Sequence, residues 1–115
     1  MKVAKLAVDG RVLISRLWVA EGMFDRMRGL LGRSGLPEDD AMLLRPCGSI
    51  HTVGMQFSID VIFLDQNQCV TRVVKALKPC RFALGGRGAH SAIEMEAGRL
   101  DLSVFSVGAP LEVLL

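Results

Sequence analysis

The chain has 115 residues, half of them apolar, and its 14 basic and 12 acidic side chains give a formal net charge of +2. This length predicts a single domain, residues 1–115, and the apolar content excludes a disordered chain. So small a charge argues against nucleic acid as a partner. Apolar runs are short, as at 61–64, and Lys2, Lys5 and Asp9 interrupt any signal-peptide core. We therefore expect a soluble, cytoplasmic protein that makes no membrane contact.

The three cysteines predict reduced thiols rather than a disulfide framework. Their number is odd, and no two of them form a C-x-x-C pair, which removes the strongest signature of zinc ribbons and of thioredoxin-like redox sites. A free cysteine often behaves as a small buried hydrophobic residue. We prefer that interpretation for Cys47, Cys69 and Cys80.

The N-terminal part predicts a β-hairpin followed by a short helix. Residues 2–8 alternate, Asp9-Gly10 suits a tight turn with positive φ angles, and 12–19 form the return strand. Residues 21–31 then change to helical spacing. Gly29 lowers helix propensity by about 1 kcal/mol, so the helix ends near residue 31 or a neighbour packs closely against the glycine. The residues that form one apolar stripe of this amphipathic helix are Met23, Met27, Leu30 and Leu31.

The remainder of the chain predicts short strands. Asp65 to Gln68 resembles a hairpin turn, and Leu84 to Gly88 forms a glycine-rich loop. Several closely spaced strands with a single helix favour a β-rich α+β domain, either a sandwich or a flattened barrel with the helix covering one opening. We expect strands at residues 41–45, 49–53, 59–64, 69–77, 92–96 and 111–114.

Polar residues gather among apolar ones between residues 49 and 60, and we predict a small polar pocket there. On a strand, His51 shares a face with Val53, whereas Thr52 shares the other face with Ile50. Because no recognised catalytic motif is present, we favour a non-enzymatic ligand-binding or accessory module without a cofactor. The predicted ligand-binding residues are Arg28, His51, Thr52, Met55 and Asp60.

Asp60 is expected to be buried, because it alternates with Ile62 and Leu64 at the start of an apolar strand. A buried carboxylate needs partners, and backbone amides, His51 or Arg28 could supply them. We favour a structural carboxylate that fixes the 54–58 loop. The alternative is a hydrolase-like enzyme in which Asp60 orients His51 as a general base.

Zinc is a second enzymatic alternative. Four soft or borderline ligands are available, which suits tetrahedral zinc. The spacing between Cys47 and His51 is not diagnostic of a metal site, and neither is that between Cys80 and His90. We therefore interpret the cysteines as buried thiols and the histidines as unrelated, and predict no metal site. The four residues are Cys47, His51, Cys80 and His90.

Charge is distributed unevenly along the chain. Between Gln66 and Ile93 there are five basic residues and no acidic one. Arg81 and Arg87 flank the glycine-rich loop, so they are the candidates for binding an anion or an acidic partner protein. We prefer the alternative that the basic residues protect a solvated sheet edge. Glu94 and Glu96 share one strand face, and like charges so placed are more often solvent-facing than catalytic.

The chain carries an ordered series of short motifs. The series begins with Arg28-Gly29-Leu30-Leu31-Gly32-Arg33 and continues with Ile50-His51-Thr52, Gly54-Met55 and the run from Ile59 to Asp65, then Ile93-Glu94-Met95, Ala97-Gly98 and Val107-Gly108. In this order the motifs resemble the uncharacterised domain of unknown function 192 family. The resemblance covers about residues 17–113 and implies a compact, jelly-roll-like sandwich with no established activity. Many relatives carry Trp-Met-Lys-Asn-Thr where this chain has residues 51–55, so it resembles a histidine-bearing branch.

Overall fold

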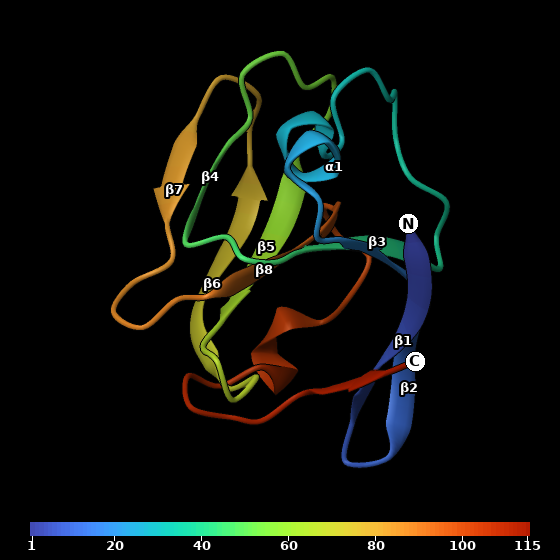
Figure 1. Ribbon diagram of the computed structural model, residues 1–115, viewed down its shortest axis with the longest axis vertical. Helices are drawn as coiled ribbons and strands as arrows, with labels where there is room; N and C mark the ends of the chain where they lie inside the picture. The colour runs from blue at the N-terminus through green and yellow to red at the C-terminus, as the bar shows by residue number, and fades with distance from the viewer.

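The computed structural model covers residues 1–115 and consists of nine strands, one α-helix and one 3₁₀ helix (Figure 1). None of the helices is long and apolar enough to cross a membrane. The strands are β1 (Lys2–Val8), β2 (Arg11–Ala20), β3 (Asp40–Leu44), β4 (Ser49–His51), β5 (Ile59–Leu64), β6 (Val70–Leu77), β7 (Phe82–Leu84), β8 (Ser91–Glu96) and β9 (Glu112–Leu114). The helices are α1 (Met23–Arg28) and η1 (Leu102–Val104).

Seven strands form one sheet in the order β6-β5-β8-β3-β2-β1-β9, which curls into a half-barrel. Only β2 and β3 are parallel neighbours, and all other pairs are antiparallel. Strands β4 and β7 form a separate antiparallel ribbon. This architecture confirms the predicted β-rich α+β domain with one short helix.

The predicted N-terminal hairpin is confirmed. Val8 pairs with Arg11 across the turn, and Asp9 and Gly10 have φ angles of 51° and 77°. Both angles are positive, as a tight type I′ turn between twisted strands requires. Strand β5 coincides with its predicted residues, and β6 lies at an edge of the sheet, as expected for a strand rich in basic residues.

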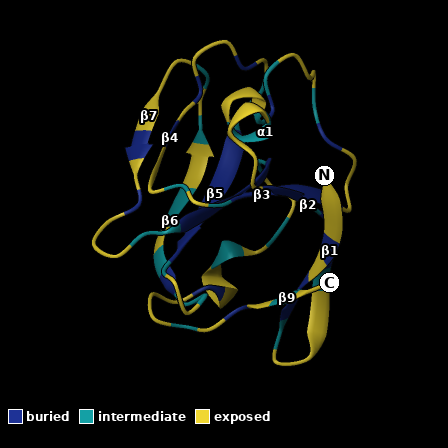
Figure 2. Cartoon of the chain, viewed as in Figure 1, coloured by how far each residue is buried: buried dark blue, intermediate teal, exposed yellow.

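Two hydrophobic clusters lie on opposite faces of the sheet. Both draw on its central strands, and β5 is buried along its length in Figure 2. Side chains alternate along each strand, so Ile62 and Leu64 of β5 belong to the first core cluster and Val61 and Phe63 to the second. The first core cluster contains residues from β1, β2, β3, β5, β6 and β8. The second core cluster is covered by the β4–β7 ribbon and by the chain around α1, through Ile50, Ala83, Leu30 and Leu36.

Helix α1 differs from its prediction in length and orientation. It ends at Arg28, because Gly29 has a φ angle of 48° and donates its N–H to the Asp25 carbonyl at 2.9 Å. The turn at Gly29 separates Leu30 from the helix, and Leu30 is the only buried residue of the predicted stripe. The apolar side chains within α1 itself are exposed to solvent. The residues concerned are Met23, Phe24 and Met27, with 71%, 76% and 71% of their surface exposed.

Strand β7 and helix η1 are not among the predicted elements. Residues 82–84 lie between a proline-containing turn and the glycine-rich loop, and their three-residue strand pairs only with β4. Gly85 follows this strand at a position with no space for a side chain. A Cβ atom there would lie 2.6 Å from Phe63 and 2.5 Å from the Cβ of Ala89. This glycine therefore allows the β4–β7 ribbon to pack directly on the sheet.

Candidate functional site

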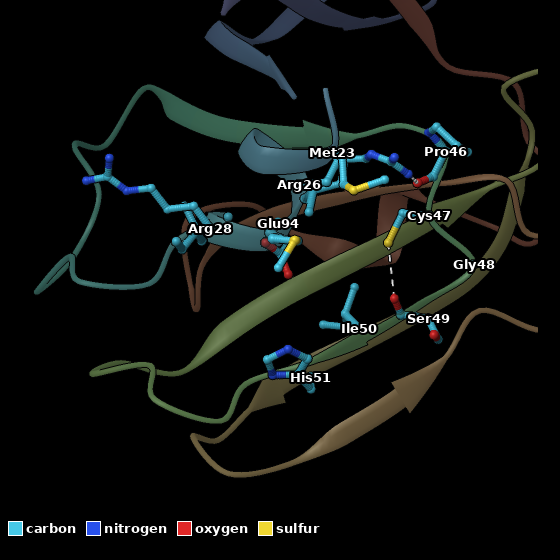
Figure 3. Close-up of a pocket in the computed structure, with 14 residues that line it drawn as sticks. Met23, Arg26, Arg28, Pro46, Cys47, Gly48, Ser49, Ile50, His51 and Glu94 are labelled. Atoms are coloured by element: carbon cyan, nitrogen blue, oxygen red, sulfur yellow. Dashed lines mark hydrogen bonds between the residues drawn. The ribbon is translucent and has the colours of Figure 1, made fainter. Parts of the chain in front are cut away.

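An open cavity of about 400 Å³ lies beneath α1 (Figure 3). Helix α1 and Gly29-Leu30 form one side, the loop at residues 46–48 and β4 form the other, and β8 contributes Glu94. The full lining is Met23, Arg26, Met27, Arg28, Gly29, Leu30, Leu44, Pro46, Cys47, Gly48, Ser49, Ile50, His51 and Glu94.

Glu94 is the buried polar group of this cavity. It lies in the middle of β8, where its sheet neighbours are Met42 on β3 and Val61 on β5. Only 4% of its surface is exposed, and no protein group donates a hydrogen bond to its carboxyl. Burial raises the pKa of Glu94 to about 7, because the charged form loses its hydration without gaining a partner. The expectation that Glu94 faces solvent is therefore wrong.

Arg26 connects α1 to the opposite wall of the cavity. Its Nη1 donates a hydrogen bond to the Pro46 carbonyl at 2.9 Å, and Figure 3 shows the side chain directed toward that residue. Its Nε is buried and has no hydrogen-bond partner. The guanidinium is therefore held at the loop between β3 and β4.

Cys47 lies beside Glu94 and Arg26 with its thiol 3.1 Å from the Ser49 carbonyl, to which it donates. Burial raises the pKa of the thiol. The backbone of Ser49 and the charge of Arg26 lower this pKa, whereas the charge of Glu94 raises it further. Because burial outweighs the lowering effects, Cys47 stays protonated at neutral pH and is a weak nucleophile.

Two of the five predicted ligand-binding residues line this cavity. His51 is exposed at the end of β4, opposite Phe82 of β7. Arg28 is exposed at the end of α1, and in Figure 3 its side chain extends away from the other lining residues. Both residues therefore form the rim of the cavity rather than its floor.

Thr52 and Met55 do not line the cavity. Thr52 is fully buried, donating its hydroxyl to the Lys78 carbonyl at 2.6 Å and accepting from the Arg81 N–H at 2.8 Å. These bonds fasten the end of β4 to the segment before β7. Met55 belongs to the second core cluster. The alternation predicted for this segment is confirmed, since Ile50 and Thr52 are buried whereas His51 and Val53 are exposed.

Asp60 lies on the other face of the sheet. It alternates with Ile62 and Leu64 toward the first core cluster, whereas Glu94 and β4 are on the face of the second. Its Oδ1 accepts from the Ala76 N–H at 2.8 Å and its Oδ2 from the Gly98 N–H at 3.1 Å. The sheet therefore separates Asp60 from His51. Its bonds fit the structural interpretation, although they fasten the segments at 76 and 98 rather than the 54–58 loop.

The four candidate zinc ligands do not converge. No three side chains of histidine, cysteine, aspartate or glutamate come together in a way that could hold a metal ion. Cys47 and His51 line the cavity beneath α1, whereas His90 lies with Asp65 and Asn67 at a second, shallow pocket. Cys80 is exposed.

Arg81 and Arg87 are both exposed and lie on either side of β7. Arg81 donates a long hydrogen bond of 3.4 Å to the Cys80 carbonyl. Anion binding by this pair stays a prediction. The residues that sequence reasoning missed are Glu94 and Arg26, and the signal for Glu94 was a charged residue inside the otherwise apolar stretch from Ala92 to Met95.

Comparisons with known proteins agree with this fold. The chain is 33% identical over 107 residues to a UPF0127 protein from Thermococcus sibiricus, covering 90% of this chain and 69% of that protein. Two crystal structures superpose with TM-scores of 0.80 over 96% of this chain. One is a protein of unknown function from Novosphingobium aromaticivorans, which is 15% identical to this chain, and the match covers 83% of its length. The other is described as a proposed transcription regulator from Sinorhizobium meliloti, which is 18% identical to this chain, and the match covers 91% of its length.

The TM-scores establish a shared fold with the two crystal structures, and identities this low carry nothing about activity. The family model for DUF192, described as an uncharacterised ACR, matches residues 4–113. This match, together with the UPF0127 relative, means that the chain belongs to the uncharacterised DUF192 family.

Proposed function

We propose that this domain is a non-enzymatic module that binds a small organic molecule in the cavity beneath α1. The observation that carries the proposal is Glu94, a buried carboxyl that faces the cavity and receives no hydrogen bond from the protein. A buried polar group without a partner is costly, and a ligand that supplies the missing hydrogen bond would remove that cost.

The size and lining of the cavity support small-molecule binding. Its volume of about 400 Å³ falls in the range of ligand pockets, 300–1,000 Å³. Leu30, Leu44 and Ile50 supply apolar surface. Polar groups on the lining can orient a ligand, namely those of Arg26, Arg28, Cys47, Ser49, His51 and Glu94.

Binding is a better interpretation than catalysis because the lining residues form no nucleophile–base pair. The two hydrogen bonds made by lining side chains join Arg26 to Pro46 and Cys47 to Ser49, and both acceptors are backbone carbonyls. Covalent catalysis requires a nucleophile within hydrogen-bond reach of a base. The predicted His51–Asp60 pair cannot supply one across the sheet.

The proposal is tested by titrating ¹⁵N-labelled protein with small fragments that include amines, alcohols, amides and carboxylic acids. We expect at least one fragment to shift the backbone amide signals of Gly29, Ile50 and Glu94 in a saturable manner. A fragment collection that leaves these signals unchanged would overturn the proposal.

A matched pair of variants assigns any binding to the cavity. Ser49→Phe places a large side chain at the cavity lining, whereas Ser15→Phe makes the same change on an exposed position of β2. Binding should be lost in S49F and retained in S15F. Equal binding by both variants would contradict the assigned site.

A further inference from the structure

We propose that the ligand is a small organic amine whose ammonium group binds the carboxylate of Glu94 and whose apolar body lies against the lining of the cavity. This inference rests on the proposed binding function and assigns a chemical class to its ligand.

The first argument is the electrostatic balance around Glu94. The charged and titratable groups that line the cavity with it are Arg26, Arg28, Cys47 and His51. Arg26 is held at the Pro46 carbonyl, Cys47 donates to Ser49, and Arg28 and His51 stand at the exposed rim. None of them donates a hydrogen bond to Glu94. Arg26 directs its Nη1 to the Pro46 carbonyl, and its buried Nε has no partner, so the acceptor oxygens of Glu94 are left for a donor on the ligand.

The second argument is the hydrogen-bonding capacity of the two partners. An ionised carboxylate is an acceptor only, with two oxygens available, and an ammonium group is a donor only. The two groups are therefore complementary, and a charge-assisted hydrogen bond between them is about twice as strong as a neutral one. An ionised carboxylic-acid ligand has no donor to offer Glu94 and would place a second negative charge beside it.

The third argument is the surface around the carboxyl. Glu94 is flanked in the sheet by Met42 and Val61. The lining adds Leu44 and Ile50, and the largely exposed Met23 and Met27 of α1. These side chains suit the methylene groups of an alkylamine. Methionine is flexible and polarisable, so it adapts to ligands of different outline.

The ionisation of Glu94 agrees with this geometry. With its pKa raised to about 7 by burial, the carboxyl is partly protonated at neutral pH and ionises fully when a cation approaches. Amine binding should therefore release a proton from Glu94 and strengthen as the pH rises.

The test compares three probes with the same four-carbon body, namely n-butylammonium, 1-butanol and butyrate, by NMR titration of the full chain. We expect n-butylammonium to bind at least ten-fold more tightly than the other two. Its affinity should rise roughly thirty-fold from pH 5.5 to pH 8, because the ionised fraction of a group with a pKa of about 7 rises by that factor. His51→Gln should retain this pH dependence, which assigns it to Glu94.

Two variants on the same strand provide the control. Glu94→Gln should weaken n-butylammonium binding at least ten-fold, whereas Glu96→Gln, which changes a carboxyl engaged by Leu36 and Arg99, should leave it unchanged. Equal binding of butyrate, or full binding by E94Q, would overturn the amine assignment. If other fragments shift the cavity signals but n-butylammonium does not, the amine assignment fails while the proposed binding function stands.

Discussion

Glu94 and Glu96 project from the same face of β8, two residues apart, but protein groups engage only Glu96. Its Oε2 accepts hydrogen bonds from the Leu36 N–H at 3.1 Å and from Arg99 at 2.9 Å. The Leu36 hydrogen bond, assisted by Arg99, holds the pKa of Glu96 below its ordinary value, whereas burial raises the pKa of Glu94. Position along the strand therefore decides whether a glutamate holds two segments together or remains free for a ligand.

Replacing Glu94 by glutamine should change the pH dependence of stability. The folded-state pKa of Glu94, about 7, exceeds its ordinary value of 4.5. The stability associated with this group is therefore complete below pH 4.5 and is lost as the pH rises through 7. The total loss is about 3 kcal/mol, at 1.36 kcal/mol per pKa unit. In urea unfolding, E94Q should match the parent near pH 4 and exceed its stability at pH 8.

The control for this measurement is Glu96→Gln. The pKa of Glu96 is lowered, so its stabilising contribution is present above its ordinary pKa and is lost as the pH falls through the lowered value. E96Q should therefore be less stable than the parent at pH 8, the opposite of E94Q. Parallel pH profiles for E94Q and the parent would show that the Glu94 carboxyl titrates normally.

Thr52→Val should destabilise the fold although the two side chains have nearly the same shape. The substitution leaves the Lys78 carbonyl and the Arg81 N–H without their buried partner. The expected loss in free energy of unfolding is about 1–3 kcal/mol. Thr52→Ser keeps the hydroxyl and should recover most of that loss when both variants are compared by urea unfolding.

Asp60→Asn should affect stability without affecting the cavity. Asparagine keeps one acceptor oxygen, so either the Ala76 or the Gly98 N–H loses its partner, at a cost of about 1–3 kcal/mol. Because Asp60 faces the first core cluster, n-butylammonium should bind D60N and the parent equally. A selective loss of amine binding in D60N would place this residue in the site after all.

Gly85→Ala should be destabilising through a clash with neighbouring atoms. The added methyl group would lie 2.6 Å from Phe63 and 2.5 Å from Ala89, closer than packed atoms tolerate. Overpacking of this kind costs about 1–3 kcal/mol. Gly22→Ala is the matched control, since its φ angle is −71° and its nearest contact would be 3.8 Å away. A thermal unfolding series should rank G85A well below G22A.

Features that depend only on residues close together in the sequence were predictable from it. The hairpin at Asp9-Gly10 follows from alternation and turn chemistry, and both are local properties. The apolar run of β5 needs no partner to be recognised. The exposure of the apolar residues of α1 was not predictable in this way, because periodicity indicates a stripe but not whether another element packs on it.

The candidate site depends on sheet order, which local patterns do not contain. Glu94 is buried because β8 lies between β5 and β3, and the sequence neighbours of β8 are β7 and η1. Alternation along β5 sets the face of Asp60, but local patterns do not show that the β4–β7 ribbon with His51 covers the other face. Once the strand order is known, the charged residue in the middle of a central strand is the clear candidate for the buried group.

Helix α1 forms one side of the cavity but is weakly attached to the molecule. None of its six residues is buried, and Gly22 provides no side-chain hydrogen bond at its N-terminus. Segments with so few buried contacts open at a small fraction of the global unfolding free energy. We expect its amide hydrogens to exchange with solvent long before those of Ile62 and Ile93, at a rate barely dependent on denaturant. This local opening would provide an entry route to Glu94 that leaves the sheet intact.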